Sequence, residues 1–227
     1  MHEGAEVFIA GGTGYIGIPL IRALVQRKHT VRALVRAGSQ HKVPVGCGSV
    51  VGNALDASSY ADRIAPSTTF VQLTGVSHPS PAKAAEFQSI DRVAGLGAID
   101  AAKNAGVQHF IYLSVAQPAP MMKDYIAVRA ECENALKISG MNVTIVRPWY
   151  VLGPGHRWPY VLLPMYWICE RIPSTREGAT RLGLVTLSQM VQTLVSAVEN
   201  PSIGARFIGV PQIRMGSALA RSASASS

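Results

Sequence analysis

The chain has little cysteine, and its three cysteines lie far apart. Cys47, Cys132 and Cys169 form no Cys-x-x-Cys pair and no disulfide framework, so we expect the protein to reside in a reducing compartment. The six histidines also lack the spacing of metal ligands. The sequence therefore predicts neither a disulfide-stabilised scaffold nor a metal site.

Long hydrophobic runs are also absent. No apolar run approaches the ~20 residues of a membrane-spanning helix, and no basic segment followed by an apolar segment opens the chain in the manner of a signal peptide. We therefore expect no stable membrane insertion and, together with the cysteine pattern, a cytoplasmic location.

Acidic residues are scarce: 13 Asp and Glu stand against 21 Lys and Arg, which gives a formal net charge of +8. The basic residues are scattered, with no dense run and no aromatic residues interleaved among them, so a nucleic-acid partner is not predicted. A solvated surface and an anionic cofactor account better for this charge. The 227 residues, 48% of them hydrophobic, are enough for a full core.

The most informative feature is an apolar run at residues 7–10 that breaks into closely spaced glycines. Gly12, Gly14 and Gly17 fit G-x-G-x-x-G, and Gly11, Gly14 and Gly17 fit G-x-x-G-x-x-G. Such a strand, tight turn and helix can hold a pyrophosphate on free backbone N–H groups at the positive end of the helix dipole. The pattern predicts a dinucleotide site formed by Gly11, Gly12, Thr13, Gly14, Tyr15, Ile16 and Gly17.

Short apolar strands alternate with helical patterns along the chain. We expect strands at 5–10, 30–36, 48–51, 68–73, 108–114 and 142–147, and helices at 15–28, 84–105 and 122–139. This alternation predicts an α/β fold, a Rossmann-type doubly wound parallel sheet. Ligands of such sheets bind beyond the carboxyl ends of the strands, which adds to the candidate ligand-binding residues Arg36, Asn53, Thr74, Gly75 and Pro148.

The end of the second strand bears on which dinucleotide is bound. A carboxylate there would bind a free ribose 2′-hydroxyl, but this chain has Arg36, with Arg32, His41 and Lys42 nearby. The planar guanidinium fork suits a phosphate monoester, so NADP(H) is favoured over NAD(H). A solvated loop arginine is the alternative interpretation of Arg36.

A group of chemically active residues follows the fifth strand. Ser114 ends that strand, and Tyr125 and Arg129, four residues apart, share one face of the next helix. A phenol is a poor acid or base at neutral pH unless a nearby cation stabilises its phenolate, and Arg129 can supply that charge. Local structural roles are the alternative interpretation of Ser114 and Tyr125.

Taken together, these motifs resemble the extended short-chain dehydrogenase/reductase superfamily. The chain looks like an atypical member, near the NmrA-like and the epimerase/dehydratase-like NAD(P)-binding proteins. The resemblance covers residues 5–155 and rests on the glycine turn, Tyr112-Leu113-Ser114, Tyr125 with Arg129, and the Arg-Pro-Trp-Tyr-Val-Leu-Gly-Pro-Gly segment at 147–155. Weaker similarity continues at residues 183–190, which resemble a strand-to-helix segment of the family.

The resemblance implies that Ser114 orients a substrate carbonyl or hydroxyl, that Tyr125 donates or accepts the proton, and that Arg129 binds the nicotinamide ribose. Arg129 stands where the family has lysine, a change that is not conservative in geometry. The family's Gly-Asp after the third strand is Gly52-Asn53 here, where the Asn53 amide can meet adenine and Asp56 would cap the next helix. The helices at 84–105 and after Tyr125 are candidates for pairing in a homodimer.

We expect the residues that recognise the substrate to lie in the segments that least resemble the family. His78 follows the fourth strand, and His156, Arg157 and Trp158 follow the sixth, so these four are the candidate substrate-binding residues. We expect a Rossmann domain at 1–155, a small C-terminal substrate-covering portion at 156–214 and a disordered tail at 215–227. The apolar segment 161–168 is assigned to a lid or to core packing in preference to a membrane surface.

Three functions remain open at this point. The first is NADP-dependent hydride transfer to or from a small carbonyl, quinone or similar compound. The second is a non-catalytic NADP(H)-binding regulator or scaffold like the NmrA-like sensors, and the third is isomerisation with tightly held cofactor, as in nucleotide-sugar epimerases.

Overall fold

The computed structural model describes residues 4–76, 80–119, 121–154, 169 and 171–216. Its main sheet has seven strands in the order β3-β2-β1-β4-β5-β6-β9, and every neighbouring pair is parallel. The strands are β1 (Glu6–Ala10), β2 (Thr30–Val35), β3 (Cys47–Val51), β4 (Thr69–Gln72), β5 (His109–Leu113), β6 (Asn142–Arg147) and β9 (Ala205–Gly209).

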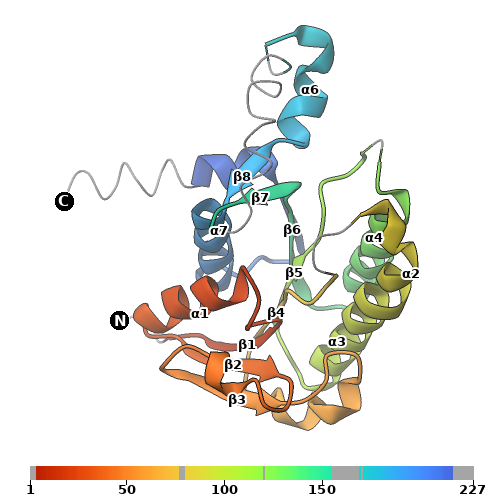
Figure 1. The fold of residues 1–227 in the computed structure, drawn as a ribbon. Coiled ribbons are helices and arrows are strands. Elements are labelled where there is room, and N and C mark those ends of the chain that lie inside the picture. Colours follow the sequence, from red (N-terminus) through yellow and green to blue (C-terminus); the bar gives the residue numbers. More distant parts are fainter. Residues whose placement is uncertain (1–3, 77–79, 120, 155–168, 170, 217–227) are drawn as a thin grey trace, which may run out of the picture.

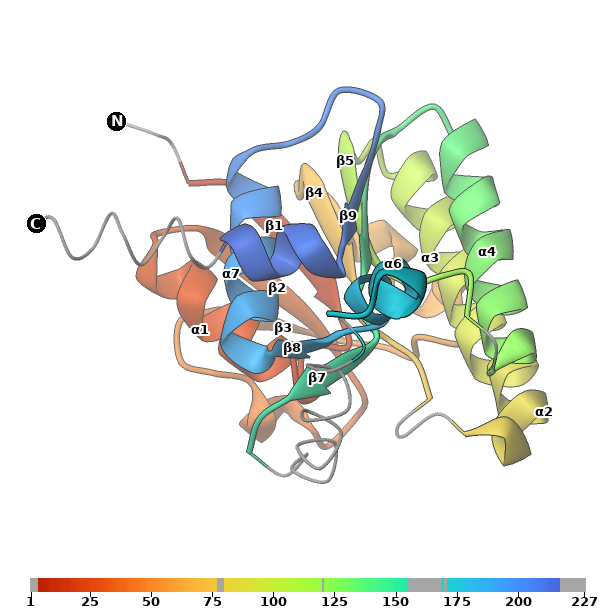
Figure 2. The ribbon, with the colours of Figure 1, turned by 90° about the horizontal axis from the view of Figure 1, so that it is seen from above.

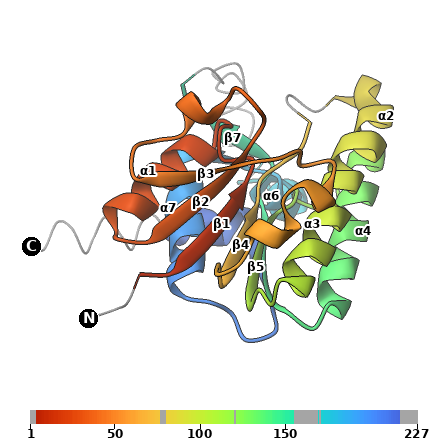
Figure 3. The same ribbon diagram turned by 90° about the horizontal axis from the view of Figure 1, so that it is seen from below.

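Helices cover both faces of this sheet, as Figures 1, 2 and 3 show from three sides. On one face lie α1 (Gly17–Gln26) and α7 (Leu187–Glu199), whose apolar residues pack against the side chains of alternate strand residues such as Val7 and Ile9. On the other face lie α3 (Val93–Asn104) and α4 (Lys123–Ile138), which pack against Phe8, Phe70 and Phe110. The predicted doubly wound fold is therefore confirmed.

The strands and helices predicted from periodicity are present with shifts of a few residues at their ends. The helix predicted at 84–105 consists of α2 (Ala84–Glu86), a π-helical turn η5 (Phe87–Arg92) and α3. The strand-to-helix segment at 183–190 is β8 (Leu184–Thr186) followed by α7, whose first turn is closed by a capping box of Thr186 and Gln189.

Four elements were not among the strands and helices predicted from the sequence. They are β7 (Tyr150–Leu152), which pairs with β8, the edge strand β9, α6 (Pro173–Arg181) and a helical segment at 210–216. In Figure 1, α6 and the β7–β8 pair lie beyond the end of the main sheet. Because β9 and α7 complete the sheet and its core, the C-terminal portion is not only a cover over the Rossmann domain.

The predicted tail begins at Met215, but residues 215 and 216 belong to the helical segment, and residues 217–227 lie outside the described residues. The apolar segment 161–168 lies outside them as well. None of the helices in the described part of the chain has both the length and the apolar character needed to cross a membrane.

His109, at the start of β5, should make folding sensitive to acid. The residue is 2% exposed, and burial together with the Arg206 cation lowers the pKa of His109 from 6.5 to about 4. The unfolded chain takes up this proton near pH 6.5 and the folded chain only near pH 4. Stability from neutral His109 is therefore present above pH 6.5 and is lost as the pH falls towards 4.

We expect this group to lower the free energy of unfolding by about 3 kcal/mol between pH 7 and pH 4. Urea unfolding of the wild type and of His109→Gln across that range measures the difference, since all other titrating groups are shared. Parallel stability curves for the two proteins would contradict the prediction.

Candidate functional site

The glycine turn joins β1 to α1 at the carboxyl edge of the sheet. Gly11 has φ +83°, a conformation that side chains rarely adopt, and a Cβ atom on Gly17 would lie 2.6 Å from the carbonyl oxygen of Gly12. The turn is closed by a hydrogen bond of 3.1 Å from the Gly14 N–H to the Gly11 carbonyl oxygen. Glycine is therefore required here so that the first turn of α1 can lie directly against the strand end.

This turn lies at the point where the strand order reverses. β1 has β2 on one side and β4 on the other, and a Cβ atom on Gly11 would meet the backbone of Leu73 and Thr74, just after β4, at 2.8 and 2.9 Å. Crevices at such switch points bind the ligands of doubly wound sheets. Of the predicted residues, Gly11–Gly17, Thr74 and Gly75 are thus brought together at this edge.

Two observations indicate that this edge of the sheet suits a pyrophosphate. No side chain caps the N-terminus of α1 and its first turn holds no acidic residue, so the positive end of the helix lies at this edge without a competing carboxylate. The Thr74 hydroxyl oxygen is buried and has no hydrogen-bond partner among the described residues. A buried polar atom of this kind calls for a ligand or water.

Arg32, within β2, and Arg36, just after it, have different surroundings. Arg36 is exposed at the carboxyl edge of the sheet, as a residue reading the ribose must be. Arg32 instead donates to the carbonyl oxygens of Arg63 and Ile64 and to the Ser67 hydroxyl, and its guanidinium lies over the Phe8 ring. Arg32 is therefore structural, and Arg36 is the one of the two that remains a candidate for binding a phosphate.

Asn53 follows β3 and is exposed. Its Oδ1 atom accepts a hydrogen bond of 3.1 Å from the Leu55 N–H, which leaves the amide N–H₂ group of the side chain directed away from that contact. Asp56 accepts hydrogen bonds from the backbone N–H and the hydroxyl of Ser58. The predicted cap is confirmed, on a short 3₁₀ turn at Ala57–Ser59.

Tyr125 and Arg129 share one face of α4, and the structure brings them into contact. The Arg129 guanidinium carbon lies 5.0 Å from the centre of the Tyr125 ring, and the centres of the Phe87 and Tyr125 rings are 4.9 Å apart. The cation therefore contacts the face of the ring. Tyr125 itself is half-buried, as a residue that must reach a substrate has to be.

Arg129 is deeply buried, at 5% exposed, and most of its donors are occupied. It donates to Asp91 Oδ1, to the Leu113 carbonyl oxygen at 2.8 Å and to the Tyr112 hydroxyl at 3.3 Å. Burial alone would lower the pKa of the Arg129 guanidinium, but Tyr112, Tyr125 and Asp91 together raise it above its ordinary value. The residue in the place of the family lysine is thus a permanently charged member of a buried network.

Asp91 was missed by the sequence analysis. It lies in the π-helical turn η5, four residues after Phe87, so one turn presents Phe87 to the Tyr125 ring and Asp91 to the Arg129 guanidinium. Asp91 Oδ2 also accepts a hydrogen bond of 3.0 Å from the Val76 N–H. The signal available in the sequence was an acidic residue within an otherwise apolar helix face.

Tyr112 is excluded as an alternative proton donor. It is buried in β5, and burial raises the pKa of its phenol above the ordinary value, so the group stays protonated. Tyr125, by contrast, is half-buried.

Ser114 follows β5 and contacts α4 at a second acidic residue that the sequence analysis missed. Its hydroxyl donates to Glu133 Oε1 at 2.6 Å, and its backbone N–H donates to the Val146 carbonyl oxygen at 2.8 Å. Glu133 lies four residues after Arg129 on α4. The three predicted catalytic residues are therefore all on α4 or in contact with it.

The Arg-Pro segment begins at the carboxyl end of β6 and contacts the residues that follow β5. The Pro148 carbonyl oxygen accepts a hydrogen bond of 2.8 Å from Ala116, and a Cβ atom on Gly153 would collide with the Tyr15 hydroxyl. The segment thus lies against the glycine turn. The four predicted substrate-binding residues, His78, His156, Arg157 and Trp158, lie outside the described residues.

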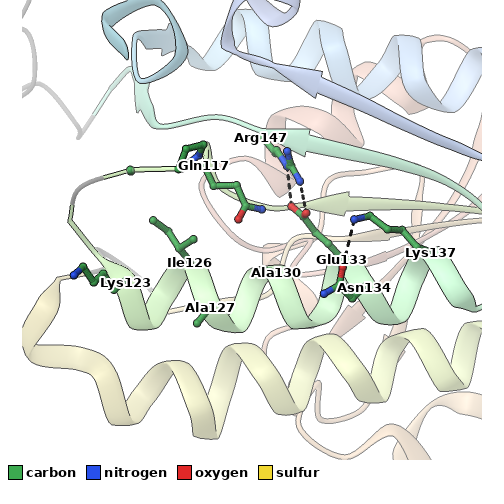
Figure 4. Close-up of a pocket in the computed structure, with 11 residues that line it drawn as sticks. Gln117, Lys123, Ile126, Ala127, Ala130, Glu133, Asn134, Lys137 and Arg147 are labelled. Carbon is green, nitrogen blue, oxygen red and sulfur yellow. Dashed lines mark hydrogen bonds and ion pairs between the residues drawn. The ribbon is translucent and has the colours of Figure 1, made fainter. Parts of the chain in front are cut away.

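A groove of about 520 Å³ lies along α4 and is shown in Figure 4. It extends between α4 and residues 117–119, with Glu133 and Arg147 among its lining residues, and does not include the glycine turn. Among the residues that the structure describes, no group of His, Cys, Asp and Glu has an arrangement suited to a metal ion.

Comparison with known proteins gives one family and several relatives. The model of a family described as NAD(P)H-binding matches residues 11–159. A ceramide reductase of Caulobacter vibrioides is 27% identical over 205 residues, which are 87% of this chain and 62% of the relative. A UDP-glucose 4-epimerase of Vibrio cholerae is 26% identical, over 86% of this chain and 67% of the relative.

Solved structures share the fold. The Bordetella bronchiseptica enzyme WbmH in complex with NAD⁺ has a TM-score of 0.68 and 20% identity, over 90% of this chain and 75% of that one. The UDP-glucose 4-epimerase of Thermus thermophilus in complex with NAD has a TM-score of 0.66 and 17% identity, over 90% of this chain and 77% of that one.

Proposed function

Because the chain belongs to the NAD(P)H-binding family, we propose that it is an NADP(H)-dependent oxidoreductase acting on a small carbonyl, quinone or similar compound. The family assignment agrees with the predicted resemblance to short-chain dehydrogenase/reductase and epimerase-like NAD(P)-binding proteins. This chain covers only 62% of the length of the ceramide reductase named above.

One observation carries the proposal: the glycine turn at the switch point lies at the same sheet edge as a half-buried tyrosine stacked on a buried cation. When bound, the dinucleotide supplies or takes up the hydride. The turn and the first N–H groups of α1 would hold its pyrophosphate, and Thr74, Gly75 and Pro148 would line the remainder of the crevice.

The chain's own residues have distinct tasks in this proposal. Tyr125 gives its hydroxyl proton to the substrate oxygen during reduction and takes it back during oxidation. Arg129 keeps a fixed positive charge against the Tyr125 ring, which favours the phenolate that remains after proton donation. Ser114 orients the substrate from the end of β5. Substrate selection is assigned to His78, His156, Arg157 and Trp158.

Arg36 is proposed to select NADP(H) over NAD(H), and a binding measurement tests this. Fluorescence titration should show NADPH binding more tightly than NADH, because the Arg36 guanidinium can contact the 2′-phosphate. Arg36→Ala should weaken NADPH binding by about 10- to 100-fold and leave NADH binding unchanged, since a hydrogen bond to a charged group contributes about 1.5–3 kcal/mol.

Arg27→Ala is the matched control for this titration. Arg27 is also an exposed arginine, but it follows the far end of α1 and pairs with Glu199. NADPH binding should not change in this variant. Equal or tighter binding of NADH by the wild type would contradict the assignment of Arg36.

A second candidate function is a non-catalytic NADP(H)-binding regulator. The observation that favours it is that Arg129 and Ser114 already form hydrogen bonds inside the protein, with Asp91 and Glu133 respectively.

An isomerase with tightly held cofactor is the third candidate function, in line with the name of the Vibrio cholerae relative. Consumption of NADPH with a panel of aldehydes, ketones and quinones supports the oxidoreductase. Binding without consumption supports one of the other two.

The partners of the chain stay predictions: a small-molecule substrate, no nucleic acid and a homodimer paired through residues 84–105 and α4. The division at residue 155 into a dinucleotide-binding part and a substrate-covering part is likewise proposed.

A further inference from the structure

Glu133 is a buried carboxylate to which the proposed chemistry gives no task. Its side chain is 2% exposed, and it lies between the end of β5, which brings Ser114, and the end of β6, which brings Arg147. A buried carboxylate is costly unless it is paired and hydrogen-bonded. Figure 4 shows the Glu133 and Arg147 side chains directed toward each other above α4.

The contacts of Glu133 determine where the protons lie. Arg147 donates from Nε to Oε1 at 2.9 Å and from Nη2 to Oε2, a two-point contact that selects the ionised carboxylate. An ionised carboxylate has no proton and can only accept. The Ser114 hydroxyl, 2.6 Å from Oε1, must therefore donate its single proton to Glu133.

This arrangement determines what Ser114 can offer to a substrate. With its proton directed to Glu133, the hydroxyl oxygen has only lone pairs for another partner. It can accept a hydrogen bond from a substrate hydroxyl or amino group, but it cannot donate one to a carbonyl oxygen.

We propose that Glu133 is a positioning residue that holds Ser114 as a hydrogen-bond acceptor, and that the substrate is a carbonyl compound with a hydroxyl or amino group beside the reacting carbon. This inference rests on the proposed function. In reduction the carbonyl carbon gains the hydride and its oxygen gains the Tyr125 proton. The neighbouring hydroxyl or amino group donates a hydrogen bond to Ser114 throughout and is neither oxidised nor reduced.

Glu133→Gln tests the inference because it reverses the polarity at Ser114. The carboxamide has one oxygen, which should take the Oε2 position and keep the hydrogen bond from Arg147 Nη2. Its N–H₂ group then takes the Oε1 position, where it loses the bond from Arg147 Nε and donates to Ser114. The Ser114 proton is then free for a carbonyl. The matched control is Glu131→Gln. Glu131 also lies on α4, but its carboxylate is exposed and is paired with Arg92 of η5.

Two ketones that differ by one hydroxyl, 3-hydroxybutan-2-one and butan-2-one, are compared as substrates with NADPH. The wild type should have a kcat/KM at least about tenfold higher for the hydroxyketone, the value of one hydrogen bond. Glu133→Gln should abolish or reverse this preference, and Glu131→Gln should retain it. A purely structural role would lower both rates equally, and an unchanged preference in folded Glu133→Gln would overturn the inference.

Nuclear magnetic resonance of the wild type provides a readout that needs neither turnover nor a Glu133 variant. The Ser114 hydroxyl proton should exchange slowly with water and give a downfield resonance that is missing in Ser114→Ala. If neither ketone nor any other probe is reduced, the proposed oxidoreductase fails, and the resonance alone decides the role of Glu133. Its presence supports the acceptor arrangement at Ser114, and its absence overturns it.

Discussion

Tyr125→Phe is expected to lower turnover of any carbonyl or quinone that the protein reduces by about 10²- to 10⁴-fold, the usual contribution of a positioned proton donor. The phenylalanine ring keeps the contacts with Phe87 and with the Arg129 guanidinium, because both are made with the ring and not with the hydroxyl. NADPH binding and the free energy of unfolding should therefore change little. Steady-state kinetics and NADPH titration of the same preparation separate the two effects.

Tyr60→Phe is the control for this experiment. Tyr60 is fully buried beside Phe8, and burial raises its pKa to about 12, so it does not exchange protons at neutral pH. Removing its hydroxyl should leave turnover unchanged. Full activity in Tyr125→Phe would contradict the proposed catalytic role.

Asp91→Asn is expected to lower the free energy of unfolding by about 3–5 kcal/mol, because it leaves the Arg129 charge buried without its counter-ion. The side chains of Arg129 and Asp91 are 6% and 0% exposed, so water cannot replace the lost partner. The substitution keeps the size and shape of the side chain, which confines the change to charge. Chemical unfolding of the wild type and the variant measures it.

The same two elements provide a control pair. Arg92 in η5 and Glu131 in α4 form a salt bridge whose side chains are 42% and 44% exposed, and Glu131→Gln should change the free energy of unfolding little. The double variant Asp91→Leu/Arg129→Met should recover much of the stability lost in Asp91→Asn, because it removes both buried charges. An effect of Asp91→Asn no larger than that of Glu131→Gln would contradict the account of this network.

Much of the fold follows from local pattern. Alternating apolar strands and amphipathic helices are repeated along the first 150 residues, and a parallel sheet covered on both faces is the arrangement that buries all of them. β9 was missed because it is an exposed edge strand, with the sequence Ala205-Arg206-Phe207-Ile208-Gly209 and no fully buried residue. Only its pairing with β6 makes it a strand.

In the candidate site, too, one part could be predicted from the sequence and another could not. The glycine turn could be read from the sequence because its requirement is local: the backbone of seven consecutive residues must turn and approach a helix. The partners of Tyr125, Arg129 and Ser114 could not, since Asp91 is 38 residues from Arg129 and Glu133 is 19 residues from Ser114. A carboxylate in a helix pattern is ordinarily assigned to the solvated face.

The sequence by itself therefore determined the doubly wound sheet, the dinucleotide turn at its edge and the tyrosine-arginine spacing on one helix face, because periodicity and short-range geometry carry that information. Only the tertiary structure decided that Arg129 is paired with Asp91, that the Ser114 hydroxyl donates a hydrogen bond to Glu133 and that Arg32 is structural. Which charges are buried against one another depends on how separate elements pack, and burial is what makes those contacts strong.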